Sequence, residues 1–246
     1  MKVMTLGQGG RLDVAARILK DTSAKEELIL LPVPTTRDKV HLKDTDLKLS
    51  YVAEKVSEGV LVAGYAIPDG TAFEISRRGG AIYDASLDEG FLYENAVLTA
   101  DGTVGHILTE LPRAPKDLHI GIVGYGRIGG CLLSRLLFLG AKVTVFSGRE
   151  RTRLELCESG VTALARDEIK DVTDMDILIN TAPAPLLDTE TVERLSSLGC
   201  HILDLASGRY LPEHSAVTKL ASVPDAMYPE SAGRIYASHI LAHLKG

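Results

Sequence analysis

Three glycines in the middle of the chain, Gly124, Gly126 and Gly129, have the spacing Gly-x-Gly-x-x-Gly. The segment 119–123 before them is rich in β-branched residues, and a leucine-rich segment of helical periodicity follows. The first glycine permits a tight turn, the second lets the backbone approach a pyrophosphate, and the third allows close helix–strand packing. In this strand–turn–helix context the spacing predicts a dinucleotide site, with the phosphates at the helix N-terminus. The alternative is a glycine-rich turn that binds nothing.

The end of the second strand indicates which dinucleotide would bind. An NAD site usually has Asp or Glu about 20 residues after the first glycine. Here the strand is followed by Ser147, Gly148 and Arg149. A hydroxyl and an arginine suit the 2′-phosphate of NADP, because a guanidinium can bond two phosphate oxygens at once. The sequence therefore favours NADP over NAD, although Arg149, Arg151 and Arg153 could instead form only the solvated start of a helix.

Predicted cofactor residues lie in four turns, each after a strand, because ligands of open parallel sheets bind beyond the carboxyl ends of the strands. The turn after the fourth strand commonly borders the ribose and nicotinamide, and the turn after the fifth would approach the nicotinamide face. A plain proline turn is the alternative for the fourth strand. The predicted residues are Gly124, Tyr125, Gly126, Arg127 and Ile128; Ser147, Gly148, Arg149 and Arg153; Thr181, Ala182 and Pro183; and Ala206 and Ser207.

The composition is typical of a globular protein and argues against nucleic-acid binding and a membrane segment. The chain has 246 residues, of which 45% are hydrophobic, enough to bury one large or two small cores. A net charge of −6, the lack of a Lys/Arg run and the absence of Trp argue against nucleic-acid binding. Because there is no signal-like apolar stretch at the N-terminus, and Arg135 interrupts the longest leucine-rich segment, we expect a cytoplasmic protein without a membrane segment.

The cysteines and histidines predict no metal site. Cys131, Cys157 and Cys200 match no metal or redox spacing and are interpreted as small buried hydrophobes in a reducing compartment. Only His239 and His243 have the spacing of a ligand pair, and no third ligand accompanies them. We interpret that pair as a polar helix face.

Strand and helix signals alternate in two blocks, each with a glycine-rich first turn. This pattern predicts an α/β fold in which a smaller flavodoxin-like domain, residues 1–100, precedes a Rossmann NAD(P)-binding domain, residues 116–229, with a cleft between them. Residues 101–115 would join the domains through a helix that begins near Asp101 and a proline-rich turn. The amphipathic helix at 230–246 is expected to pack back on the first domain.

Several further segments, in the same order, resemble those of the dipicolinate synthase A-subunit family, and the resemblance covers most of the chain. It implies an architecture akin to that of formate and glycerate dehydrogenases, with a substrate domain before the cofactor domain. The segments that carry it, besides the glycine fingerprint and its Ser-Gly-Arg tail, are Leu31–Thr36, Glu94–Thr103, Asp176–Pro183, Leu203–Ser207 and Ser231–Gly233.

The resemblance also implies an activity and partners. The activity is oxidation of a dihydrodipicolinate-type heterocycle, or of its hydroxy-tetrahydro precursor, to pyridine-2,6-dicarboxylate with NADP as acceptor. A flavoprotein-like B subunit would be the partner, the role would be in sporulation, and we expect a homo-oligomer. An alternative that the residues leave open is a non-catalytic NADP-binding module that regulates or assembles a partner, because a fold alone implies no activity.

A 2-hydroxy-acid dehydrogenase-like enzyme is another alternative. Such enzymes use an Arg after the fifth strand, a distant Glu, and a His just after a proline near the last helix. Arg209 stands after the fifth strand, but Pro229 is followed by Glu230. A carboxylate cannot exchange a proton near neutral pH as an imidazole does without a large pKa shift, which disfavours this alternative. Aromatising a ring needs mainly alignment and a proton acceptor, and the sequence assigns no catalytic residue.

The predicted substrate residues are polar side chains that could hold a small dicarboxylate. One arginine follows the first glycine turn at a helix start, a second follows the fifth strand, and two threonines end a strand. The first arginine could instead only cap the helix toward solvent, the second could form a surface salt bridge, and the threonines could simply form turns. The residues are Arg11, Thr35, Thr36, Asn95, Thr99 and Arg209.

Overall fold

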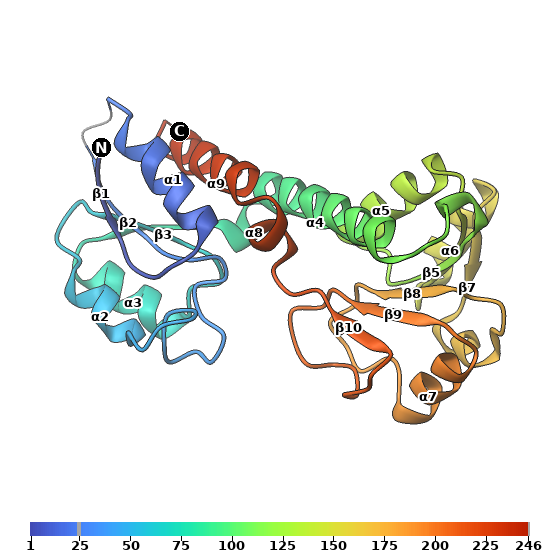
Figure 1. Ribbon diagram of the computed structural model, residues 1–246. Helices are drawn as coiled ribbons and strands as arrows, with labels where there is room; N and C mark the ends of the chain where they lie inside the picture. The colour runs from blue at the N-terminus through green and yellow to red at the C-terminus, as the bar shows by residue number, and fades with distance from the viewer. Residues whose placement is uncertain (24–25, 246) are drawn as a thin grey trace. The chain divides into compact units, whose positions relative to one another are not determined.

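Parallel sheets covered by helices on both faces organise the chain into two units. The computed structural model describes residues 1–23 and 26–245 (Figure 1). Unit 1 comprises Met1–Asn95 and Pro224–Gly246, and unit 2 comprises Ala96–Val223. The predicted α/β class, with a smaller α/β unit before a Rossmann unit, is confirmed.

Unit 1 is built on a four-stranded parallel sheet with the sequential order β1-β2-β3-β4. Flavodoxin has the order 2-1-3-4-5, so the expected likeness holds for the layers and not for the strand order. A sequential order lacks the reversal point at which open sheets usually bind ligands. The strands are β1 (Lys2–Thr5), β2 (Glu27–Leu30), β3 (Leu61–Gly64) and β4 (Ala81–Asp84).

The helices of unit 1 cover both faces of this sheet, because its strands are apolar on both sides. In β2, Leu28 and Leu30 contribute to one buried cluster and Ile29 to the other. Figure 1 shows α1 and α9 side by side over one face and α2 and α3 over the other. The bounds are α1 (Gly10–Lys20), α2 (Leu49–Glu54), α3 (Asp69–Arg77) and α9 (Pro229–His243), with a 3-10 turn at Ala85–Leu87.

Unit 2 has a six-stranded parallel sheet of order β10-β9-β8-β5-β6-β7. This is the Rossmann arrangement, in which the strand order reverses between β5 and β8. The strands are β5 (His119–Val123), β6 (Lys142–Phe146), β7 (Thr162–Leu164), β8 (Ile177–Asn180), β9 (His201–Asp204) and β10 (Val217–Lys219). The helices are α5 (Arg127–Phe138), α6 (Glu150–Glu158) and α7 (Thr189–Ser197), with 3-10 turns at Pro115–Asp117 and Arg166–Asp171.

Two further helices contain the points at which the units divide. Helix α8 (Val223–Met227) contains the second of them. Helix α4 runs without interruption over Glu89–Glu110, so the expectation that it begins near Asp101 was wrong. Its start is capped by Asp88, whose Oδ1 accepts a hydrogen bond from the Phe91 backbone N–H at 3.0 Å. Burial of one face, which includes Phe91 and Ala100, overrides the turn preference of the Asp-Gly pair at 101–102.

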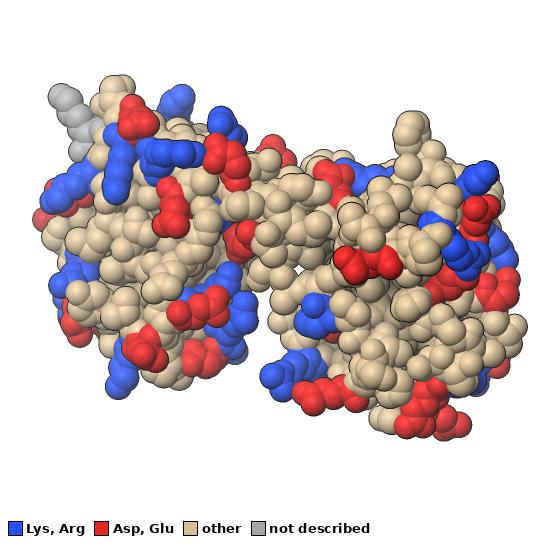
Figure 2. All heavy atoms as spheres, in the orientation of Figure 1, with Lys and Arg blue, Asp and Glu red and all other residues tan. Residues whose placement is uncertain are grey.

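Charges of both signs lie on the surface, and two of the three cysteines are buried. On the face that Figure 2 presents, Lys and Arg are interspersed with Asp and Glu. Cys131 and Cys200 are buried as expected, whereas Cys157 is exposed, which corrects its interpretation as a core residue. Within 1–23 and 26–245 no helix is long and apolar enough to cross a bilayer. The same residues include no cluster of three or more His, Cys, Asp or Glu that could hold a metal.

The packing of α1 on α9 depends on Gly233. A Cβ at this position would lie 2.5 Å from the Cβ of Val14 and 2.8 Å from the Arg11 carbonyl oxygen. We predict that Gly233→Ala lowers the free energy of unfolding by about 1–3 kcal/mol through overpacking. Urea unfolding followed by circular dichroism measures this.

A matched control is the helical glycine Gly70 in α3, where an added Cβ meets no atom within 4 Å. Gly70→Ala should raise the free energy of unfolding by about 0.5–1 kcal/mol, because alanine loses less backbone entropy in a helix. Equal effects at the two positions would contradict the packing argument.

Candidate functional site

The glycine turn of unit 2 has the geometry that a bound pyrophosphate needs. Gly124 adopts φ +93°, which glycine tolerates best. A Cβ on Gly129 would lie 2.3 Å from the Gly124 carbonyl oxygen, so glycine is required for α5 to start this close to β5. A Cβ on Gly126 would meet no atom within 4 Å, and the space beside it is open. The N-terminus of α5, which begins at Arg127, therefore has an accessible approach for an anion.

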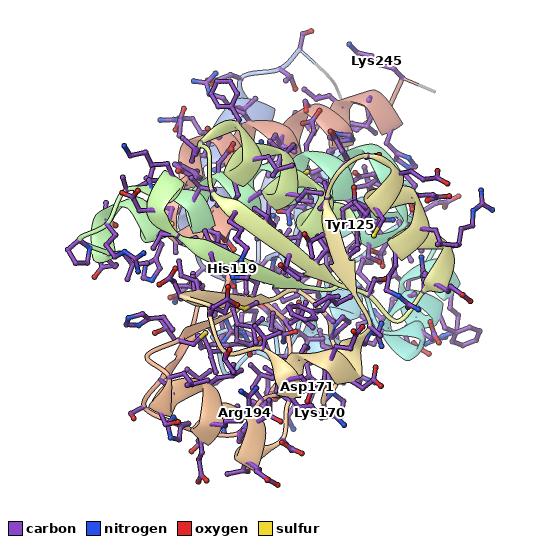
Figure 3. All side chains as sticks on the ribbon, turned by 90° about the vertical axis from the view of Figure 1, so that its right-hand side faces the viewer. His119, Tyr125, Lys170, Asp171, Arg194 and Lys245 are labelled. Atoms are coloured by element: carbon purple, nitrogen blue, oxygen red, sulfur yellow. The ribbon has the colours of Figure 1, made fainter. Side chains whose placement is uncertain are left out.

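The other predicted residues of this turn flank the same helix start. Tyr125 and Arg127 are exposed and Ile128 is half-buried. Figure 3 labels Tyr125, just past the carboxyl end of β5, and His119, the first residue of that strand. The His119 ring is buried and contacts Thr144 Oγ1 through Nε2 at 2.9 Å. It therefore belongs to the end of the strand away from the glycine turn.

The turn after β8 is tied to the glycine turn by a hydroxyl. Thr181 Oγ1 donates to the Val123 carbonyl oxygen at 2.9 Å and lies 3.3 Å from the Gly124 carbonyl oxygen. Thr181 therefore positions the turn through backbone contacts across the reversal point of the sheet. Ala182 and Pro183 follow it, and the Ala182 backbone N–H donates to Asn180 Oδ1 at 3.2 Å.

The turn after β6 is surrounded by guanidinium groups. Ser147 is buried, and its Oγ accepts from the Arg149 backbone N–H at 3.2 Å. Arg153 Nη1 donates to the Ser147 carbonyl oxygen at 2.9 Å, so this arginine supports the backbone of the turn. A Cβ at Gly148 would lie 2.9 Å from Cζ of Arg166, which means that this guanidinium lies against the glycine.

Arg149 in this turn and Arg166, whose guanidinium lies against Gly148, are two cations available to a ligand. Both are exposed, and within the described part of the chain neither guanidinium has a hydrogen bond or ion pair. Arg151, by contrast, is paired with Glu155 of its own helix at 2.8 Å. Sequence reasoning missed Arg166 because it lies far beyond Gly148 in the chain, at the start of the 3-10 turn after β7.

The turn after β9, which contains the predicted Ala206 and Ser207, is held by a buried carboxylate. Asp204 accepts from Asn180 Nδ2 at 2.9 Å, from the Ala206 backbone N–H at 3.1 Å and from Lys219 Nζ at 2.7 Å. Lys219 also donates to the carbonyl oxygens of Ala206 and Gly208. The turn is therefore preorganised by side chains that the sequence analysis did not single out.

Arg209 is far more exposed than a buried carboxylate anchor would be. Its side chain is 92% exposed and lies 3.3 Å from Glu213. The salt-bridge alternative describes this arrangement, and a role in substrate binding stays a prediction. Glu230, at the position where hydroxy-acid dehydrogenases have His, pairs with Arg17 and Arg234 at 2.9 Å each on the surface of unit 1.

Unit 1 contains a buried cluster of charges around the predicted Arg11. This side chain is 4% exposed, and its Nη2 donates to Asn95 Oδ1 at 2.9 Å. Its Nε lies 2.8 Å from Asp225 Oδ1, although the N–H is not directed at that oxygen. Burial lowers the pKa of Arg11, and the Asp225 carboxylate acts in the opposite direction.

Lys43 is the second cation of the cluster, and the sequence analysis missed it. It is 8% exposed, and its Nζ lies 3.2 Å from both Asp225 Oδ2 and the Val33 carbonyl oxygen. Lys43 and Asp225 are separated by 182 residues in sequence. No local pattern could have indicated that they meet.

The predicted hydroxyls of unit 1, those of Thr35 and Thr36, form hydrogen bonds within the protein. Thr35 is fully buried, and its Oγ1 accepts from the Tyr65 backbone N–H at 2.9 Å. Thr36 forms a local turn with Asp38, whereas the predicted Thr99 belongs to unit 2 and is buried on α4. Of the predicted substrate residues, the structure therefore brings together Arg11 and Asn95. A role for any of them in binding substrate stays a prediction.

Comparison with known proteins places this geometry in a class. No family model matches the sequence. The fold is shared with an NAD-complexed D-isomer specific 2-hydroxyacid dehydrogenase from Lactobacillus delbrueckii ssp. bulgaricus, with a TM-score of 0.54 and 11% identity over 99% of this chain and 96% of that one. The chain thus has the fold of a 2-hydroxyacid dehydrogenase.

Within that class the chain is similar to the A-subunit of dipicolinate synthase, which confirms the resemblance. It is 29% identical to the Bacillus subtilis (strain 168) protein over 162 residues, 61% of this chain and 54% of that protein. The match therefore spans about half of that relative's length. The crystal structure of the Bacillus halodurans protein has a TM-score of 0.83 at 19% identity, covering 100% of this chain and 98% of that one.

Substitutions in the glycine turn should separate ligand binding from folding. We predict that Gly126→Ala changes the free energy of unfolding by less than about 1 kcal/mol, because the added methyl group meets no atom. It should weaken nucleotide binding about tenfold or more by filling the space beside the helix N-terminus. Gly129→Ala should instead lower the free energy of unfolding by about 3 kcal/mol, since the contacted backbone oxygen cannot move cheaply.

Titration calorimetry and chemical unfolding on the same two variants measure these effects. Normal nucleotide affinity in Gly126→Ala would show that the pyrophosphate does not lie over this turn.

Lys219 is predicted to preorganise the turn after β9. Lys219→Met leaves the Asp204 carboxylate, which is 3% exposed, without its cation. The expected loss is about 1–3 kcal/mol in the free energy of unfolding. Nucleotide affinity should fall as well, because the Ala206 and Gly208 carbonyl oxygens lose their donor. Lys170→Met, at an exposed lysine labelled in Figure 3, is the control and should match the wild type in both measurements.

Proposed function

We propose that this chain is an NADP-dependent oxidoreductase that converts a dihydrodipicolinate-type ring, or its hydroxy-tetrahydro precursor, to pyridine-2,6-dicarboxylate. The observation that carries the proposal is the open, glycine-lined start of α5. The same unit has two exposed guanidinium groups that pair with no described residue, Arg149 in the turn after β6 and Arg166 just after β7. The similarity to the dipicolinate synthase A-subunit supports the substrate class.

The chain's own residues account for nucleotide binding. The N–H groups at the start of α5 would hold the pyrophosphate, with Gly126 leaving room for it. Arg149 and Arg166 would clamp the 2′-phosphate, because each guanidinium offers two parallel N–H donors to phosphate oxygens. No carboxylate occupies residues 147–149, where an acid would repel that phosphate.

The proposed reaction needs little acid–base machinery from the protein. When bound, NADP supplies the hydride acceptor. A dihydropyridine ring, present as such or formed from the hydroxy-tetrahydro precursor by loss of water, becomes aromatic when it gives up one hydride and one proton. The side chains must then bind the two ring carboxylates and let the proton leave to solvent. Arg11 in unit 1 is the best placed of the predicted residues to bind one of them, because it is buried with an incompletely paired charge.

A non-catalytic NADP-binding module remains the second candidate. The observation in its favour is that none of Thr181, Ala182, Pro183, Ala206 and Ser207 titrates near neutral pH, so these turns supply no proton acceptor. In either case a flavoprotein-like B subunit is the proposed partner, and self-association is proposed as well. Oxidation of the substrate by the chain with NADP, followed as the rise of absorbance of the reduced cofactor, separates the two candidates.

Cofactor choice tests the proposal directly. Titration calorimetry should show tighter binding of NADP than of NAD. The double substitution Arg149→Gln with Arg166→Gln should weaken NADP binding about tenfold or more and leave NAD binding unchanged, since only the 2′-phosphate loses donors.

Arg151→Gln is the control with loss of a surface charge in the same region, because that side chain is paired within its own helix. It should bind NADP as the wild type does. If NAD and NADP bind equally, the 2′-phosphate assignment is wrong; if neither binds, the oxidoreductase proposal fails.

A further inference from the structure

The charge cluster of unit 1 holds more positive than negative charge. Arg11 and Lys43 are both more than nine-tenths buried and share the single carboxylate of Asp225. The Asp225 carboxylate raises the pKa of Arg11, against the larger lowering effect of burial. Two buried cations with one counter-ion leave an uncompensated positive charge, which is costly in a region of low dielectric.

The hydrogen bonds of the cluster are incomplete as well. Within the described residues, Nη1 of Arg11 is buried and has no hydrogen-bond partner, and its Nε is poorly aligned with Asp225. A guanidinium normally binds a carboxylate through two parallel N–H donors. The buried face of Arg11 is therefore suited to a better-placed carboxylate than the one it has.

Asp225 is the most accessible member of the cluster. Its side chain is 18% exposed, compared with 5% for Arg11 and 8% for Lys43. It lies in the five-residue helix α8, close to the point where unit 2 ends at Val223. A ligand from solvent would therefore meet the Asp225 carboxylate first, in front of the two cations.

We propose that Arg11 and Lys43 form a binding site for one carboxylate of a small acid, and that Asp225 occupies this site until the ligand's carboxylate replaces it. Asn95 completes the site by holding Nη2 of Arg11. The choice of a dicarboxylate as ligand rests on the proposed function, whereas the site itself rests on the cluster.

A hollow of about 470 Å³ nearby is a poorer anion site. It is lined by residues 37–38 and 41–46, Lys43 among them. Its three acidic residues, Asp38, Asp44 and Asp46, outnumber the cations Arg37 and Lys43, and this excess of negative charge disfavours an anion. The ligand carboxylate is therefore placed at the position of Asp225 and not in the hollow.

The test is titration calorimetry of the whole chain with pyridine-2,6-dicarboxylate, in the absence of nucleotide. Asp225→Asn removes the competing charge and should bind the acid about tenfold more tightly than the wild type, while Lys43→Met should bind it about tenfold more weakly. Lys48→Met, at an exposed lysine of the same loop, is the control and should match the wild type.

Thermal melting checks that the variants fold. Lys43→Met leaves Arg11 and Asp225 as a balanced pair and should melt no lower than the wild type. If Asp225→Asn does not fold, the proposal is tested by comparing the dicarboxylate affinities of Lys43→Met and Lys48→Met. Wild-type affinity in Lys43→Met, or weaker binding by a folded Asp225→Asn, overturns the proposal.

A parallel titration with NADP separates this inference from the proposed function. NADP binding by every variant, with no dicarboxylate binding by any, overturns the carboxylate site and leaves the nucleotide site intact. If Asp225→Asn binds the dicarboxylate more tightly and Lys43→Met more weakly, but no variant binds NADP, the carboxylate site is supported and the proposed oxidoreductase is overturned.

Discussion

The close approach of Gly129 to the Gly124 carbonyl oxygen is the constraint on which the glycine turn depends. A single methyl group at position 129 would come within 2.3 Å of that oxygen, so the start of α5 can approach the end of β5 this closely only because position 129 is glycine. This close approach directs the unpaired N–H groups of the helix toward the open side of the turn. Thr181, which bonds to the same backbone segment, then sets the neighbouring turn across the sheet.

A second constraint is electrostatic. Buried charges are normally paired one to one, since desolvation of an unpaired ion is expensive. In unit 1, Arg11 and Lys43 share Asp225, and in unit 2, Asp204 is satisfied by Lys219 together with Asn180. The balanced cluster therefore serves to hold a backbone turn, whereas the unbalanced one is the candidate for binding an anion.

The sequence predicts best the features that are determined by residues close together in the chain. The glycine spacing, the strand before it and Ser147 at the next strand end were read from neighbouring residues, and the fold class followed from the alternation of strand and helix signals. Helix α4 was misjudged because Asp101 and Gly102 resemble a helix boundary, while burial of the face that includes Phe91 carries the helix through.

The residues that the sequence did not reveal are those brought together by tertiary structure. Lys43 and Asp225 meet although 182 residues separate them in sequence. Arg166, which follows β7 in the chain, lies against Gly148. Arg11 could be predicted from its place at a helix start, but its burial could not. Pairing across such distances is set by the packing of whole elements, which hydrophobic periodicity alone does not specify.

The most direct test of the account is a crystal structure of the chain grown with NADP and pyridine-2,6-dicarboxylate. We expect the pyrophosphate over Gly126, the 2′-phosphate between Arg149 and Arg166, and a carboxylate on Arg11 in place of Asp225. A nucleotide bound away from the start of α5, or a 2′-phosphate directed to solvent away from both arginines, would contradict this expectation.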